Sequence, residues 1–198
     1  MAQQVQLHNK YFWICTVSTA IFMLSCRHNQ PVVPSVFVNI SQPFKTQQGI
    51  TSLNNKLFSG WQFGLYATGD TALLVPYYNG KENGIVKSWY ANRQLSEVRI
   101  YTDGKKTGVH KAWWPDDKPK FEYHFVNDVY EGSVKEWNAA GLLYKEFQYK
   151  NGQENGLQRQ YFSDGSLQFN YEAKNGRNYG WTGVKNCVNI KDSIEKTN

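Results

Sequence analysis

The sequence predicts an all-β protein, built as an elongated antiparallel β-meander of stacked 24-residue β-hairpins. One observation is a glycine that returns every 24 residues, at Gly60, Gly84, Gly108, Gly132, Gly156 and Gly180. Another is that apolar and polar residues alternate in the second half of each unit, which is the period of a strand. The third is composition, because 16% of the residues are aromatic and Gly is frequent. That mixture favours strands and tight turns over helices.

Residues 1–25 are expected to be a signal peptide and not part of the fold. A polar start is followed by YFWICTVSTAIFML, an apolar run that is too short to span a bilayer comfortably. Ser25 stands directly before Cys26, and a small residue before such a cysteine resembles the lipobox of bacterial lipoproteins. The resemblance implies cleavage before Cys26 and acylation of this residue, which would anchor the protein in a membrane. The alternative is a plain signal peptide or an uncleaved anchor.

Residues 26–50 are expected to form a lipid-anchored tether with a possible N-terminal cap strand. The segment contains three prolines and several Asn and Gln residues, which is typical of a linker. Its stretch VFVNI, residues 36–40, has the composition of a strand.

Residues 51–180 are predicted to form the repeat array, with about five units of period 24. In each unit a first strand follows the recurrent glycine, and a second strand ends at an Asn-Gly or Asp-Gly turn such as Asn79-Gly80. These pairs supply the positive φ that hairpin turns need. One hairpin cannot bury enough surface alone, so neighbouring units must stack.

Residues 181–198 are expected to be a C-terminal cap and tail. They contain Cys187, which stays without a cysteine partner if Cys15 leaves with the signal peptide and Cys26 is acylated. Cys187 is either a buried packing residue or a redox-active or dimerising thiol.

The pattern N-G-x-x-x-G, as in residues 79–84 and 151–156, is followed by an aromatic strand and a second turn. It resembles the MORN repeat in its bacterial variant form. Whole chains of this build, with a signal peptide, are similar to proteins catalogued as toxin–antitoxin system YwqK-family antitoxins. The resemblance covers about residues 53–180 and implies that the repeats bind a protein partner. Departures from the pattern are Asp128 at a Gly position, and Arg93 and Asp117 where other turns have Gly141 and Gly165.

A column of aromatic residues recurs at one position of the unit, and we call it the aromatic ladder: Trp89, Trp113, Trp137 and Tyr161. On a stacked sheet these residues are expected to lie at one height. The ladder is either a structural column or a stacking platform for sugar rings or a partner's peptide. Single-stranded nucleic acid could use the same rings, but the expected export argues against nucleic acid as a partner.

No constellation of residues supports catalysis, and no cofactor or metal is expected. Walker, Rossmann and zinc-type spacings are absent from the sequence. His110 and His124 are expected on one hairpin as ordinary surface residues, with His110 opposite Phe125 and His124 opposite Lys111. Glu82 and Glu154 are expected to solvate their turns, too far apart to act as an acid pair.

These observations predict a non-enzymatic lipoprotein of the bacterial cell envelope, membrane-anchored on the periplasmic or surface side. Its repeat sheet is expected to mediate protein–protein interaction, in the manner of the YwqK-type antitoxins. The alternatives are a cell-wall or glycan-binding module that uses the aromatic ladder, and a sheet that binds lipid directly.

Overall fold

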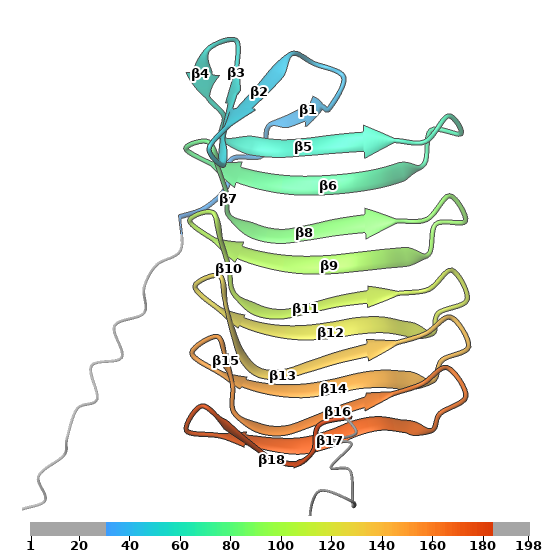
Figure 1. Ribbon diagram of the computed structural model, residues 1–198. Coiled ribbons are helices and arrows are strands. Elements are labelled where there is room, and N and C mark those ends of the chain that lie inside the picture. Colours follow the sequence, from blue (N-terminus) through green and yellow to red (C-terminus); the bar gives the residue numbers. More distant parts are fainter. Residues whose placement is uncertain (1–30, 184–198) are drawn as a thin grey trace, which may run out of the picture.

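The computed structural model describes residues 31–183, and every helix or strand in this range is a β-strand. Fifteen strands form one long sheet, and a separate sheet has the order β2-β3-β4 (Figure 1). The strands of the long sheet stack one after another in chain order, so the molecule is elongated across its strands. The all-β prediction and its hairpin organisation are confirmed.

The long sheet follows the order β1-β5-β6-β8-β9-β11-β12-β13-β14-β16-β17-β18, with three short strands beside this path. Its N-terminal strands are β1 (Phe37–Asn39), β5 (Gly60–Leu65), β6 (Thr71–Tyr78), β8 (Gly84–Trp89) and β9 (Leu95–Thr102). Its later strands are β11 (Gly108–Trp113), β12 (Pro119–Val126), β13 (Val129–Trp137), β14 (Leu143–Lys150), β16 (Gly156–Tyr161), β17 (Leu167–Lys174) and β18 (Arg177–Trp181). The short strands are β7 (Lys81–Glu82), β10 (Lys105–Lys106) and β15 (Gln153–Glu154). The small sheet contains β2 (Phe44–Gln47), β3 (Ile50–Leu53) and β4 (Lys56–Leu57).

Neighbouring strands of the long sheet are antiparallel except for β1, which runs parallel to β5. Strand β1 lies in the segment where a cap strand was expected. The small sheet follows it at the same end of the array, where the N–H of Thr51 donates to the carbonyl of Gly80 at 2.7 Å. Phe44 and Phe58 meet edge to face at 5.1 Å and close the core at this end.

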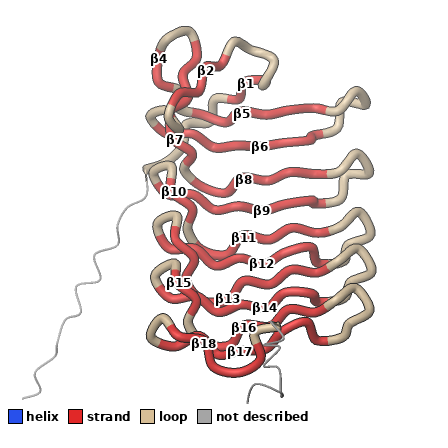
Figure 2. The backbone as a smooth tube through the Cα atoms, in the orientation of Figure 1, coloured by secondary structure: helices blue, strands red, loops and turns tan. Residues whose placement is uncertain are grey.

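Two kinds of turn connect the strands, one kind at each end of the strands (Figure 2). At one end, pairs such as Asn151-Gly152 both have positive φ, 49° and 76°, as the tight hairpin turn requires. At the other end, the turn residues at the Gly141 position all have positive φ, and they are Gly69, Arg93, Asp117, Gly141 and Gly165. Arg93 and Asp117, which stand where other units have glycine, therefore keep the same kind of turn.

The chain bends where each short strand meets the recurrent glycine. Gly84, Gly108, Gly132, Gly156 and Gly180 all have positive φ, between 66° and 120°. At the equivalent Gly60 a Cβ atom would lie 2.5 Å from the carbonyl oxygen of Val36, so no larger residue fits there. This bend folds the short strands over one face of the sheet.

The hydrophobic core lies on that face, which we call the core face. Many of its buried side chains recur at two positions of the unit, and they are Tyr77, Tyr101, Phe125 and Ala173 at one, and Val86, His110, Val134 and Gln158 at the other. Side chains from the folded-over segments cover them: the Lys106 ammonium lies 5.3 Å from the Phe125 ring, and Tyr130 stacks on the same ring at 4.6 Å. We call the opposite side, with Ile85, Lys87 and their equivalents, the open face.

The predicted signal peptide, Cys26 and Cys187 lie outside the described residues. Within residues 31–183, no helix is long and apolar enough to cross a membrane.

Candidate functional site

The aromatic ladder recurs in one place on the fold, at the end of each first strand. Trp89, Trp113, Trp137 and Tyr161 all sit at a β-bulge, where the pairing with the second strand shifts by one residue. A bulge re-aims the side chain that follows it. As a result the ladder side chains lie along one border of the open face, beside the turns.

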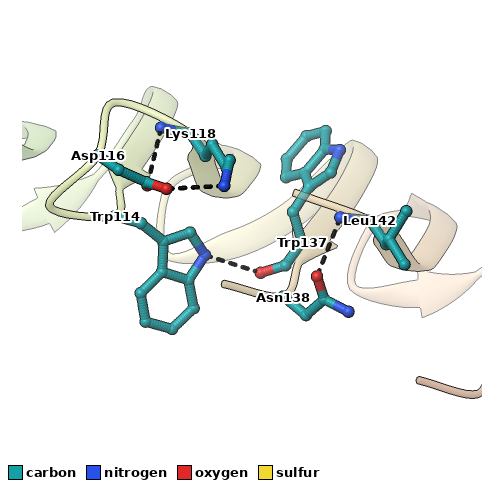
Figure 3. A network of polar contacts seen from close by, with 6 residues as sticks. All are labelled: Trp114, Asp116, Lys118, Trp137, Asn138 and Leu142. Carbon is teal, nitrogen blue, oxygen red and sulfur yellow. Dashed lines mark hydrogen bonds and ion pairs between the residues drawn. The ribbon is translucent and has the colours of Figure 1, made fainter. Parts of the chain in front are cut away.

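Hydrogen bonds between units fix the backbone of the ladder. The hydroxyl of Tyr66 donates to the carbonyl of Trp89 at 2.6 Å, and the hydroxyl of Tyr90 donates to that of Trp113 at 2.8 Å. The indole Nε1 of Trp114 donates to the carbonyl of Trp137 at 3.1 Å (Figure 3). Each donor reaches the next unit, so these bonds join units into one body.

The ladder rings do not form the aromatic stack of the described molecule. Its longest run of ring contacts lies on the core face and passes through Tyr101, His110, Phe125, Tyr130 and Tyr149 at centroid separations of 4.6–5.6 Å. That column includes Tyr101, Phe125 and Tyr149, which are 24 residues apart in the sequence. The core is therefore built by this column, and the ladder is left on the open side.

One member of the ladder, Trp89, borders a large groove. Its volume is about 690 Å³, and it is lined by Phe37, Phe63, Leu65, Asp70, Thr71, Leu74, Trp89 and Arg93. Phe37 and Leu65 are 60% and 48% exposed, which is unusual for large apolar side chains. Because neighbouring Trp61 stacks on Phe37 at 6.1 Å, the apolar surface continues beyond the groove.

An ion pair stands at one side of this groove. The Nε of Arg93 lies 2.8 Å from Oδ1 of Asp70, and both residues belong to turns of successive units. Arg93 occupies the turn position with positive φ (69°). The groove therefore offers apolar walls with one carboxylate and one guanidinium, which is the usual make-up of a recognition site.

Two further ladder residues, Trp113 and Trp137, border a much smaller cleft of about 130 Å³. Tyr161 lies in β16, at the bulge opposite Leu167. Trp89, at the N-terminal end, therefore borders a groove large enough for a side chain or ring of a partner.

A row of charges crosses the middle of the open face, and sequence reasoning missed it. Lys111 pairs with Glu122 at 2.9 Å, and Glu146 lies 3.4 Å from Lys135 and 3.6 Å from Arg159. The signal in the sequence is again the period of 24, since Lys87, Lys111, Lys135 and Arg159 share one position. From Lys111 to Arg159 the signs alternate, so each of the two carboxylates, Glu122 and Glu146, lies between two cations.

A polar cluster on the core face gathers around Glu136. Its carboxylate accepts hydrogen bonds from the Tyr144 hydroxyl and from the Lys145 ammonium at 3.0 Å. Burial favours a higher pKa for Glu136, but these hydrogen bonds outweigh it, and the pKa lies below its ordinary value. Burial and the Glu136 carboxylate together raise the pKa of Tyr144 to about 12. Both groups are therefore fixed in their ordinary charge states at neutral pH.

The predictions for the two histidines were wrong in register, and for His110 also in burial. His110 lies opposite Tyr123 and His124 opposite Val109, because the strand begins at Gly108 and shifts the pairing by two residues. His110 is 2% exposed, and its Nε2 lies 3.1 Å from the N–H of Ile100. Burial lowers the pKa of His110, which keeps its imidazole neutral at pH 7.

Glu82 and Glu154 belong to different short strands, β7 and β15. Glu154 accepts a hydrogen bond from the hydroxyl of Tyr171 at 2.8 Å, so it serves the core face as well as its turn. Burial raises the pKa of Glu82, and the charges of Arg99 and Lys106 oppose that rise. Within residues 31–183, no group of three His, Cys, Asp or Glu side chains could hold a metal ion.

Comparison with protein-family models and with curated proteins gives no match for this chain.

Proposed function

We propose that the protein is a non-enzymatic lipoprotein of the bacterial cell envelope whose MORN-like repeat sheet binds a protein partner. The observation that carries the proposal is the groove beside Trp89, with its exposed apolar walls and its Asp70–Arg93 ion pair. Exposed apolar surface rimmed by polar groups is typical of protein interaction sites. The resemblance to YwqK-type antitoxins supports a protein as the partner, and the lipobox-like sequence supports an anchored position.

The groove is built before any partner arrives. The Tyr66 hydroxyl holds the backbone of Trp89, and the ion pair holds the side chain of Arg93 toward the preceding turn. A preformed site loses little conformational entropy when it binds. Trp and Arg are also the residues that most often dominate binding energy at protein interfaces.

Photo-crosslinking in cells tests the proposal. A photoreactive residue at Leu65, 48% exposed in the groove wall, is expected to capture one recurrent protein. The same residue at Leu142, 47% exposed in a distant turn, is the matched control and is expected to capture none.

Formation of the crosslinked adduct from position 65 should also depend on Trp89, the ladder residue at the groove. Adding Trp89→Ala is expected to abolish the Leu65 adduct, whereas Trp137→Ala should leave it. Identical adducts from positions 65 and 142, or an adduct that ignores Trp89→Ala, would contradict the proposal.

A second candidate is glycan binding at the same groove. It is favoured by the aromatic wall beside a carboxylate and a guanidinium, which can stack on a sugar ring and bond its hydroxyls. Retention of the protein on peptidoglycan that is lost with Trp89→Ala would favour this candidate, and absence of retention would remove it.

A further inference from the structure

The C-terminal strand of the sheet has one side free among the described residues. Strand β18 pairs with β17 over five residues, from Lys174↔Arg177 to Asn170↔Trp181, without a register shift. It is the last strand of the sheet, and all of its residues are exposed. Its free side therefore presents backbone N–H and C=O groups that can pair with another strand.

The two ends of the array differ in this respect. At the N-terminal end the last strand is β1, which has only three residues and is followed by a turn. Short edge strands are one of the ways in which proteins limit pairing with other chains. Strand β18 contains Gly180 with its φ of 114°, but it has neither a proline nor a register shift, and its Tyr179 and Trp181 are 54% and 47% exposed.

Strand β18 is complementary to itself. If two copies pair antiparallel about a two-fold axis, one register matches all five residues, and its centre is Tyr179. Arg177, Tyr179 and Trp181 lie on one face of the sheet, because they are opposite Lys174, Glu172 and Asn170. In this register Arg177 of each copy lies opposite Trp181 of the other copy. The two Tyr179 rings lie beside each other at the two-fold axis.

These pairs are favourable ones. Residues directly opposite in an antiparallel pair have Cβ atoms about 5 Å apart, close enough for the side chains to interact. A guanidinium over a Trp ring gains cation–π attraction, and aromatic pairs across strands are among the stabilising combinations. Arg177 is also the only charged residue of β18, so no like charges oppose each other directly.

We propose that two copies of this protein associate through β18, edge to edge, to form one continuous sheet. The contact is isologous, so it closes at two copies and does not propagate. This inference goes beyond the proposed function and does not use the groove beside Trp89, which lies near the other end of the array.

Sedimentation of the full chain in detergent solution tests the inference. The wild type is expected to have twice the mass of one chain. Tyr179→Lys places two like charges opposite each other at the two-fold axis and is expected to sediment as a single chain. Phe162→Lys makes a similar change at a 51% exposed position in a turn, and should stay dimeric.

Mixing charge variants separates a lost contact from a lost fold. Tyr179→Lys and Tyr179→Glu should each be single chains, and their equimolar mixture should recover the dimer mass. A wild type that sediments as one chain, or a Tyr179→Lys variant that remains dimeric, overturns the inference. If a variant loses the circular dichroism of the folded protein, the test instead uses an otherwise unchanged chain with a photoreactive residue in place of Asn178. Absence of a crosslinked two-chain adduct then overturns the inference.

Discussion

At the scale of single residues, the buried position shared by Val86, His110, Val134 and Gln158 shows how the fold tolerates polar side chains. Beside Val86, His110 and Gln158 the preceding strand diverges from the first strand, and its backbone loses a sheet partner, whereas at Val134 the strands β12 and β13 stay paired. Gln158 replaces that partner, because its amide accepts from the N–H of Gln148 at 3.3 Å and donates to the carbonyl of Gln148 at 2.8 Å. The Nε2 of His110 lies 3.1 Å from the backbone nitrogen and 2.9 Å from the carbonyl oxygen of Ile100, and it bonds one of the two, according to which ring nitrogen carries the proton.

This arrangement predicts how stability depends on pH. The pKa of His110 is lowered in the folded protein, so the folded state binds fewer protons than the unfolded state, whose histidine titrates near about 6.5. Stability is therefore complete above that pH and falls as the pH drops below it, by at most about 1.4 kcal/mol for each pH unit. His110→Gln, which copies Gln158, is expected to remove this loss.

Urea unfolding at about pH 7.5 and about pH 5.5, roughly one unit on either side of the ordinary histidine pKa, measures the effect. The reciprocal change Gln158→His is expected to add a second loss of the same sign in a later unit. Equal pH dependence in the wild type and in His110→Gln would show that His110 is not the group responsible.

At the scale of elements, the turns of successive units keep one backbone shape despite different residues. The N–H of Gly141 donates to the carbonyl of Asn138 at 2.9 Å, and the equivalent bond joins Asp117 to Trp114 at 3.0 Å. Asp117 has a φ of 66°, a region that is unfavourable for residues with a Cβ atom. This strain is local to the turn, because the backbone hydrogen bonds from Asp117 to Trp114 and from Trp114 to Lys118 are kept.

Asp117→Gly is therefore expected to stabilise the protein by roughly 0.5–1 kcal/mol. Asp116→Gly is the matched control, because it makes the same chemical change one residue earlier and removes the ion pair with Lys118 at 2.8 Å. Urea midpoints should move in opposite directions for the two variants. A shift in the same direction would mean that turn strain is not relieved.

Most of the strands and turns could be predicted from the sequence, because turn residues and the alternation of apolar and polar residues are local properties. The second strands end directly before the turns that the sequence predicts, as β9 (Leu95–Thr102) does before Asp103-Gly104. The partner of His110 could not be predicted, since the bend at Gly108 decides the register and depends on contacts with other units. The groove beside Trp89 also escaped prediction, because Phe37 reaches it through β1, which pairs with β5 across 24 residues of sequence.

At the scale of the whole molecule, the contacts that join the units weaken toward the C-terminus. Tyr66, Tyr90 and Trp114 each donate to the following unit, but the equivalent Asn138 instead accepts from Leu142 within its own turn (Figure 3). The next equivalent, Phe162, has no donor in its side chain. The buried aromatic position also changes from Phe125 to the much smaller Ala173.

In a repeat protein each unit is stabilised by its neighbours, so weaker junctions lower the local stability of the units beside them. Hydrogen exchange should therefore be slowest in β8 to β12 and progressively faster toward β16 and β17. Tyr90→Phe, which removes the 2.8 Å bond to the carbonyl of Trp113, should accelerate exchange at that junction more than in β16. Uniform protection from β8 to β17 would mean instead that the array opens as one cooperative body, in which the individual junctions do not set the local stability.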